Sequence, residues 1–100
     1  MHARHFSKGK LKWSLLPISV LEEVIKVLMW GARKYGDNNW MRGTEWSEYY
    51  NSGQRHRAAF WSGEDKDSES KLYHLSHSIV DDMFLLWYTI FKVGRDDRPK

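Results

Sequence analysis

The sequence predicts an all-α protein in which three main helices form a bundle. Apolar residues of segment 18–34 recur with the 3.6-residue helical period. No segment alternates apolar and polar residues as a half-buried strand does. Glycine, asparagine and proline gather between the periodic segments, where they end helices and form turns. One domain fits the chain length of 100 residues.

The first predicted helix covers residues 18–34. Pro17 fixes the backbone just before it. The apolar stripe of this helix comprises Val20, Leu21, Val24, Val27 and Leu28. Segment 35–43 is dense in glycine, asparagine and aspartate, so we expect a loop there.

The second predicted helix covers residues 45–62, with Thr44 as its N-cap and Gly63 at its end. Gly53 lies inside this helix, which indicates close packing against another helix. An acidic linker of residues 64–70 follows.

The third predicted helix covers residues 71–93 and has two alternatives for its start. In the first, Asp67 or Ser68 caps the helix and the rest of the linker is solvated. In the second, the linker contributes residues to a site.

We divide the chain into a flexible basic leader (1–12), a single all-α domain (13–93) and a charged tail (94–100). The domain must accommodate most of six tryptophans, five tyrosines and four phenylalanines. Three helices of this length bury too little surface for so many aromatic side chains. We therefore expect oligomerisation, as a homodimer or homotetramer, to complete the bundle.

Composition excludes several classes of protein. The chain has no cysteine, which rules out disulfides and thiolate chemistry and fits a cytoplasmic protein. No apolar run approaches the roughly 20 residues that a membrane span needs. The net charge is +3, but residues 13–91 carry 8 Lys and Arg against 11 Asp and Glu. This mildly acidic body argues against a nucleic-acid partner.

His74, His77 and Asp81 carry the strongest functional signal. Their spacings of three and four residues place them on one stripe of the third helix. Apolar residues surround that stripe, so at least part of it should face the interior, where an unpaired charge is costly. A divalent metal ion is a suitable partner for a buried acid with two histidines.

The first helix begins with two acids that the helical wheel separates. Glu22 shares a stripe with Lys26, which predicts a surface ion pair. Glu23 lies with Val27 and Trp30 at the edge of the core, which makes it a site candidate. The alternative is that Glu23 only makes a charge contact at the helix N-terminus.

His56 faces the same way as Gly53 on the second helix and is a candidate additional ligand or a hydrogen-bonded core histidine. Glu64 follows this helix and would lie near the site if the helices are antiparallel. Three helices that each supply an inward ionisable group are typical of metal sites in bundles. Ligation rich in carboxylate oxygen favours Mg²⁺ or Mn²⁺.

Several short segments of the chain follow the pattern of a known family. These segments are Ser14-Leu-Leu-Pro17, Gly31-Ala-Arg-Lys-Tyr-Gly-Asp-Asn-Asn-Trp40, Arg55-His56, Ser62-Gly-Glu-Asp65, Asp67-Ser-Glu-Ser70 and His74-Leu-Ser-His77. They resemble the phage- and prophage-associated family called dATP/dGTP diphosphohydrolase-like, which is similar to the MazG-type all-α nucleoside triphosphate pyrophosphohydrolases. The resemblance covers about residues 12 to 92. It implies Mg²⁺- or Mn²⁺-dependent hydrolysis of a (deoxy)nucleoside triphosphate to monophosphate and pyrophosphate in a helical oligomer.

Within that reaction we expect Glu23 and Asp81 to be catalytic. The expected metal ligands are Glu23, Glu64, His77 and Asp81, with His56 and His74 as additional candidates. Lys34 and Arg55 would neutralise phosphate charge, and Asn38, Asn39 and Trp40 would contact the base. Trp40 could instead fill the core at a helix junction.

Two alternatives remain open. MazG-type enzymes carry a Glu-Glu-x-x-Glu helix, whereas Lys26 stands at the last of these positions here. That difference is consistent with a non-catalytic nucleotide-binding or regulatory oligomer. A nucleic-acid-binding module that uses the basic leader and exposed aromatics is the other alternative.

Overall fold

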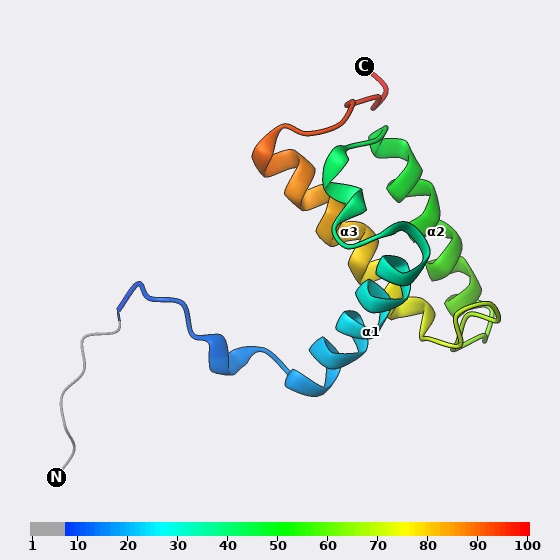
Figure 1. The fold of residues 1–100 in the computed structure, drawn as a ribbon. Coiled ribbons are helices and arrows are strands. Elements are labelled where there is room, and N and C mark those ends of the chain that lie inside the picture. The colour runs from blue at the N-terminus through cyan, green and yellow to red at the C-terminus, as the bar shows by residue number, and fades with distance from the viewer. Residues whose placement is uncertain (1–7) are drawn as a thin grey trace, which may run out of the picture.

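The computed structural model describes residues 8–100, so most of the predicted flexible leader lies outside the described residues. Three α-helices make up the body (Figure 1): α1 (Ile18–Tyr35), α2 (Trp46–Trp61) and α3 (His74–Phe91). Two short 3-10 helices, η1 (Trp13–Leu15) and η2 (Asn39–Arg42), precede α1 and α2. Residues 8–100 contain no strand beyond two isolated bridges, which confirms the all-α prediction.

Helices α2 and α3 form an antiparallel pair. His56 lies against His74 at one end, and the Trp46 indole donates to the Val93 carbonyl at the other. Between them, a β-carbon added to Gly53 would lie 3.6 Å from the Asp81 β-carbon. The close helix packing predicted at Gly53 is therefore confirmed.

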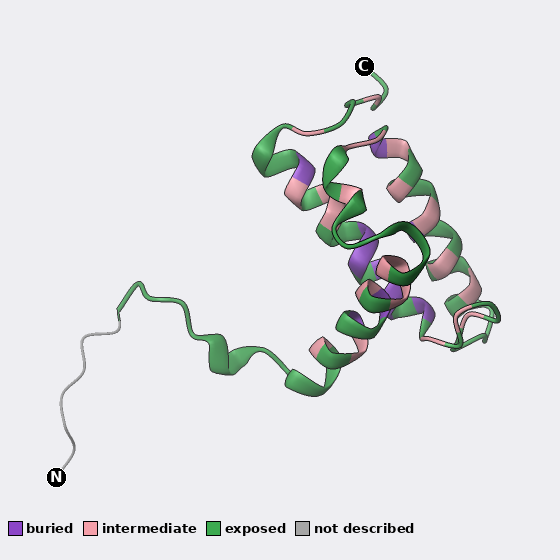
Figure 2. Cartoon of the chain, in the orientation of Figure 1, coloured by how far each residue is buried: buried purple, intermediate pink, exposed green. Residues whose placement is uncertain are grey.

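Buried segments, purple in Figure 2, occur in each of the three helices. The core has an aliphatic part and an aromatic part. Val24 and Val27 of α1 pack with Val80 of α3, supported by Leu28, Leu72 and Phe84. In the aromatic part, Trp40 stacks on Phe84 with ring centroids 4.3 Å apart and meets Trp87 edge to face. The fully buried Tyr88 donates its hydroxyl to the Trp40 carbonyl. These contacts hold the loop between α1 and α2 against α3.

The start of α1 projects away from the α2–α3 pair (Figure 1). Ile18 is 61% exposed and Val20 is 48% exposed, although the helical period places Val20 on the apolar stripe. Only the middle of that stripe is buried within one chain. No helix in residues 8–100 combines the length and hydropathy needed to cross a bilayer.

The third helix starts later than predicted. It begins at His74, and Lys71 adopts a positive φ of 65°, which is incompatible with a helix. Neither Asp67 nor Ser68 caps it, because Tyr73 occupies the N-cap position. The Asp67 carboxylate instead accepts from the Ser70 N–H inside the linker. Backbone hydrogen bonds from Asp67 N to the Leu72 carbonyl and from His74 N to the Asp65 carbonyl close the linker into a compact loop.

The predicted Thr44 cap of α2 is also wrong. Glu45 occupies the N-cap position without a side-chain cap, and the C-terminal tail supplies the missing acceptors. The Trp46 N–H donates to the Arg95 carbonyl, and the Ser47 N–H donates to the Asp97 carboxylate at 3.0 Å. The backbone of Thr44 accepts from Arg95 N–H, so this segment pairs with the tail and does not cap the helix.

Candidate functional site

A cleft of about 1130 Å³ lies between α1, the α1–α2 loop, α2 and α3. Most predicted site residues reach it from different elements. Those that line it are Asn38, Asn39, Trp40, Arg55, His56, His77 and Asp81. The tertiary fold thus brings together residues up to about forty positions apart in the sequence.

Asp81 supplies a buried carboxylate to the cleft. It is 7% exposed, and its Oδ2 atom has no hydrogen-bond partner among the described residues. Burial raises the pKa of Asp81 to about 6. Its neighbour Asp82 is exposed. The buried polar stripe predicted for α3 is confirmed, because His74 and His77 are buried as well.

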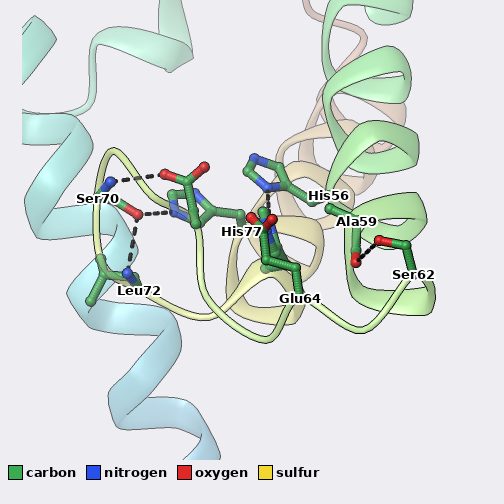
Figure 3. Close-up of polar contacts among 9 residues, drawn as sticks. His56, Ala59, Ser62, Glu64, Ser70, Leu72 and His77 are labelled. Carbon is green, nitrogen blue, oxygen red and sulfur yellow. Dashed lines mark hydrogen bonds and ion pairs between the residues drawn. The ribbon is translucent and has the colours of Figure 1, made fainter.

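Three imidazoles meet where α2 approaches the start of α3 (Figure 3). The Nδ1 atoms of His56 and His74 are 2.8 Å apart. The ring of His77 lies parallel to that of His56, with centroids 4.5 Å apart and planes at 7°. His74 Nε2 is 2.7 Å from a Glu64 carboxylate oxygen. Glu64 therefore lies close to the histidines, as the antiparallel arrangement predicted.

The contact with Glu64 determines which ring nitrogens of His74 and His56 carry a proton. A carboxylate only accepts, so His74 donates from Nε2. A neutral His74 then presents a lone pair at Nδ1, and His56 donates its Nδ1 proton to it. The Nε2 atom of His56 is left with a free lone pair.

Residues of the linker between α2 and α3 contact the histidine cluster through His77. The Ser70 hydroxyl lies 2.7 Å from His77 Nε2, and the Ser70 N–H donates to Asp67 Oδ2 at 2.8 Å (Figure 3). Although burial opposes it, bonding by Ser70 holds the pKa of Asp67 below its ordinary value.

The histidines on the cleft side favour the neutral form. Burial, reinforced by the neighbouring His77 and His74, lowers the pKa of His56 to about 4. Burial also lowers the pKa of His77. Neutral imidazoles keep the lone pairs that proton transfer or metal binding requires.

Two predicted residues are engaged elsewhere. The Glu23 carboxylate accepts from Lys26 Nζ at 2.7 Å, and Glu23 is not among the residues that line the cleft. The predicted Glu22–Lys26 pair is therefore wrong, because the i, i+3 partner holds Lys26. Lys34 pairs with Glu69 at 3.0 Å and lies over the Trp30 ring.

Trp40 has a packing role in this structure. Its ring is stacked on Phe84 and its carbonyl accepts from Tyr88, which matches the helix-junction alternative, although it also borders the cleft. Asn38, Asn39 and Arg55 are exposed at the cleft and remain available to a ligand.

Asp67 is the member of the site whose role the sequence did not reveal. An aspartate three residues before a serine is a turn signal, and this local signal was present in Asp67-Ser-Glu-Ser70. Its approach to the histidines depends on the linker closing, which no local pattern specifies. His56, Asp67 and His74 each offer one ligand atom, and these atoms lie within 4.8 Å of one another, so they could hold a metal ion.

Comparison with known proteins identifies the family. A family model described as "dATP/dGTP diphosphohydrolase, N-terminal" matches residues 2–98. The chain belongs to this family. Members include phage proteins: the chain is 33% identical over 93 residues to a dATP/dGTP diphosphohydrolase of Salmonella phage PMBT28.

The match covers 93% of this chain but 32% of the phage dATP/dGTP diphosphohydrolase. The chain thus spans about a third of the length of that relative. No solved structure matches the chain.

Proposed function

We propose that this chain is a metal-dependent nucleotide pyrophosphohydrolase that cleaves a (deoxy)nucleoside triphosphate to the monophosphate and pyrophosphate. The observation that carries the proposal is the buried Asp81 carboxylate, whose Oδ2 atom has no partner, at a cleft that also holds neutral histidines. Membership of the family and the name of the phage relative support dATP or dGTP as the substrate.

The cleft offers each part of a nucleotide a matching surface. Arg55 carries a permanent positive charge for the phosphates. Asn38 and Asn39 offer amide donors and acceptors for the base or sugar. Trp30 and Tyr35 add aromatic surface on the side of α1. These groups would orient the triphosphate with its α-phosphorus toward Asp81, so that the water attacks from the Asp81 side and pyrophosphate leaves from the opposite side.

Asp81 is suited to accept the proton of the attacking water. A carboxylate with a pKa of about 6 is ionised at neutral pH and still basic enough to act as a general base. A bound divalent cation would neutralise phosphate charge and lower the pKa of the attacking water. Asp81 and His77 stay in this proposed site, whereas Glu23 is left out because Lys26 holds it on the surface.

The homo-oligomer also remains a proposal. Ile18 and Val20 at the start of α1 and Leu86 and Ile90 on α3 are between 48% and 61% exposed. Apolar groups gathered on helix faces are typical of an interface. We propose that a second copy covers the projecting part of α1.

A second function is favoured by the length of the relative. The chain spans about a third of the phage relative. In this second function the matched third binds the nucleotide, and hydrolysis is performed by the part of the relative that this chain does not match. This alternative predicts binding of dATP or dGTP without release of pyrophosphate.

The deciding experiment incubates the purified chain with a panel of deoxynucleoside triphosphates and Mn²⁺ or Mg²⁺, with products resolved by chromatography. We expect monophosphate and pyrophosphate in equal amounts. Asp81→Asn should lower the rate by at least about 100-fold, whereas Asp82→Asn, on the exposed neighbour, should not. Tight nucleotide binding without product would favour the second function.

A further inference from the structure

Two histidine nitrogens from different helices are directed at one point. His56 Nδ1 on α2 and His74 Nδ1 on α3 are 2.8 Å apart. At that distance two lone pairs repel and two N–H groups clash, so the nitrogens must share either a proton or a metal ion. Because the α2–α3 packing fixes this approach, the site is built before any ligand arrives.

His74 already has the environment of a metal ligand. Its side chain is 5% exposed, and its Nε2 atom donates to Glu64 at 2.7 Å. In metal sites a ligating histidine almost always donates its other N–H to a carboxylate, carbonyl or water, which orients the ring and raises its basicity. Glu64 therefore leaves the Nδ1 lone pair of His74 available for a metal.

Asp67 supplies an oxygen donor from the linker. One of its carboxylate oxygens is held by the Ser70 N–H, and Ser70 in turn contacts His77. His77 stacks on the His56 ring, so two separate contacts restrict the donors (Figure 3). Asp67 and His56 both line the cleft, so an ion bound between them would face a ligand there.

We propose that His56, His74 and Asp67 bind one divalent first-row transition-metal ion, with Glu64 as the carboxylate that orients His74. Two imidazoles and one carboxylate suit Mn²⁺, Fe²⁺, Co²⁺ or Zn²⁺, whereas Mg²⁺ prefers oxygen ligands and water. These residues would bind the metal ion that the proposed hydrolysis requires. The biological role of the metal site rests on that proposed function. Metal binding itself can be measured without catalysis.

The test is a Co²⁺ titration of the tag-free full chain after treatment with a chelator, followed by visible absorption. The chain has five histidines, and His2 and His5 lie outside the described residues. The background protein therefore carries His2→Gln and His5→Gln. We expect one Co²⁺ per chain with ligand-field bands typical of nitrogen and oxygen ligation, and no displacement by Mg²⁺ at the same concentration.

Matched variants assign the ligands. Asp67→Asn keeps an oxygen that can accept from Ser70 and should weaken Co²⁺ binding by at least about tenfold. Glu64→Gln should weaken it by about 10- to 100-fold. Asp65→Asn, on an exposed neighbour in the same linker, is the control and should bind normally. Helicity measured by circular dichroism identifies any variant that fails to fold, and His56→Gln then replaces it.

The outcomes separate the two proposals. Unchanged Co²⁺ binding in folded Asp67→Asn and His56→Gln proteins would overturn the metal site. Hydrolysis supported by Mg²⁺ in a chain that binds no Co²⁺ would also overturn the metal site, but it would leave the proposed function standing. Co²⁺ binding that depends on these residues, in a chain that hydrolyses no nucleotide, would uphold the site and contradict the function.

Discussion

Asp81 shows how one residue can be costly for folding and useful for chemistry. Its carboxylate is buried beside Gly53, where α2 passes close enough to exclude most of the solvent. Burial without a partner for Oδ2 disfavours the charged form. Such an arrangement is expected where function, and not stability, selects the residue.

The first prediction concerns the stability of Asp81→Asn in metal-free buffer. The pKa of Asp81 is about 6 in the folded chain, above its ordinary value of 3.8. The folded state therefore holds the proton more tightly, and stability falls as pH rises through this window. Asp81→Asn should be more stable than the wild type by roughly 1 to 3 kcal/mol at about pH 7.5, with a smaller difference near pH 4.

Urea unfolding followed by circular dichroism measures this difference. The control is Asp82→Asn, whose exposed side chain should give no pH-dependent gain. If Asp81→Asn loses stability at neutral pH, the carboxylate has a structural partner and the site must be rebuilt around it.

The second prediction is that neither Glu22→Gln nor Glu23→Gln changes metal affinity by more than about twofold. Glu23 is paired with Lys26, and neither acid lines the cleft. The helical wheel favoured Glu23 because it lies beside the core, but its side chain turns outward to the nearest cation. Calorimetric titration checks this, and a large loss in Glu23→Gln alone would restore it as a ligand.

At the scale of elements, the start of α2 depends on a distant segment. The tail places the Asp97 carboxylate where it accepts from the Ser47 N–H in the first turn of the helix, and a negative charge there also interacts favourably with the helix dipole. Gly94 makes this approach feasible, since it has a φ of +77° and lies directly against Thr44.

The third prediction follows from that contact. A β-carbon at Gly94 would clash with the Thr44 carbonyl oxygen. Gly94→Ala should therefore lower the free energy of unfolding by about 2 kcal/mol or more, through both backbone strain and displacement of the tail. The control is Gly36→Ala, because Gly36 also has a positive φ, of +94°, but has open space around it.

Thermal unfolding of the two variants separates strain from steric contact. Gly36→Ala should cost roughly 1 to 3 kcal/mol from the backbone conformation alone, and Gly94→Ala should cost more, because the tail must also move. Equal losses in both proteins would mean that the tail does not hold its position on α2 in solution.

At the scale of the whole molecule, the fold leaves apolar surface uncovered. Ile18 and Val20 at the start of α1 are exposed, and so are Leu86 and Ile90 on α3. The buried aliphatic core of one chain consists of Val24, Val27 and Val80 with a few half-buried neighbours. A core of that size favours association as a source of further stability.

The fourth prediction is that light scattering gives a mass at least twice the chain mass of 12.0 kDa at micromolar concentration. Ile18→Lys combined with Val20→Lys should shift the mass toward one chain, because it places two charges in the proposed interface. Ile90→Lys is the comparison, and dissociation by that variant alone would move the interface to α3. A wild-type mass of 12.0 kDa would contradict the oligomer.

The features that depend on local periodicity and turn chemistry could be predicted from the residues alone. The helical period located α1 to within one residue at its end, and Gly63, with its φ of +106°, ends the turn after α2 as predicted. The spacing of His74, His77 and Asp81 placed three polar groups on one buried stripe, because side chains three and four residues apart share a helix face.

The contacts between groups from distant segments depended on how the whole chain packs. It directed Glu23 to Lys26, brought Asp67 to His56 and His74, and used Asp97 in place of Thr44 at the start of α2. Each of these contacts depends on how the side chains, the linker and the tail pack together, which no local sequence pattern specifies. A helical period fixes the face on which a residue lies, but the packing of distant segments selects the partner that it finds there.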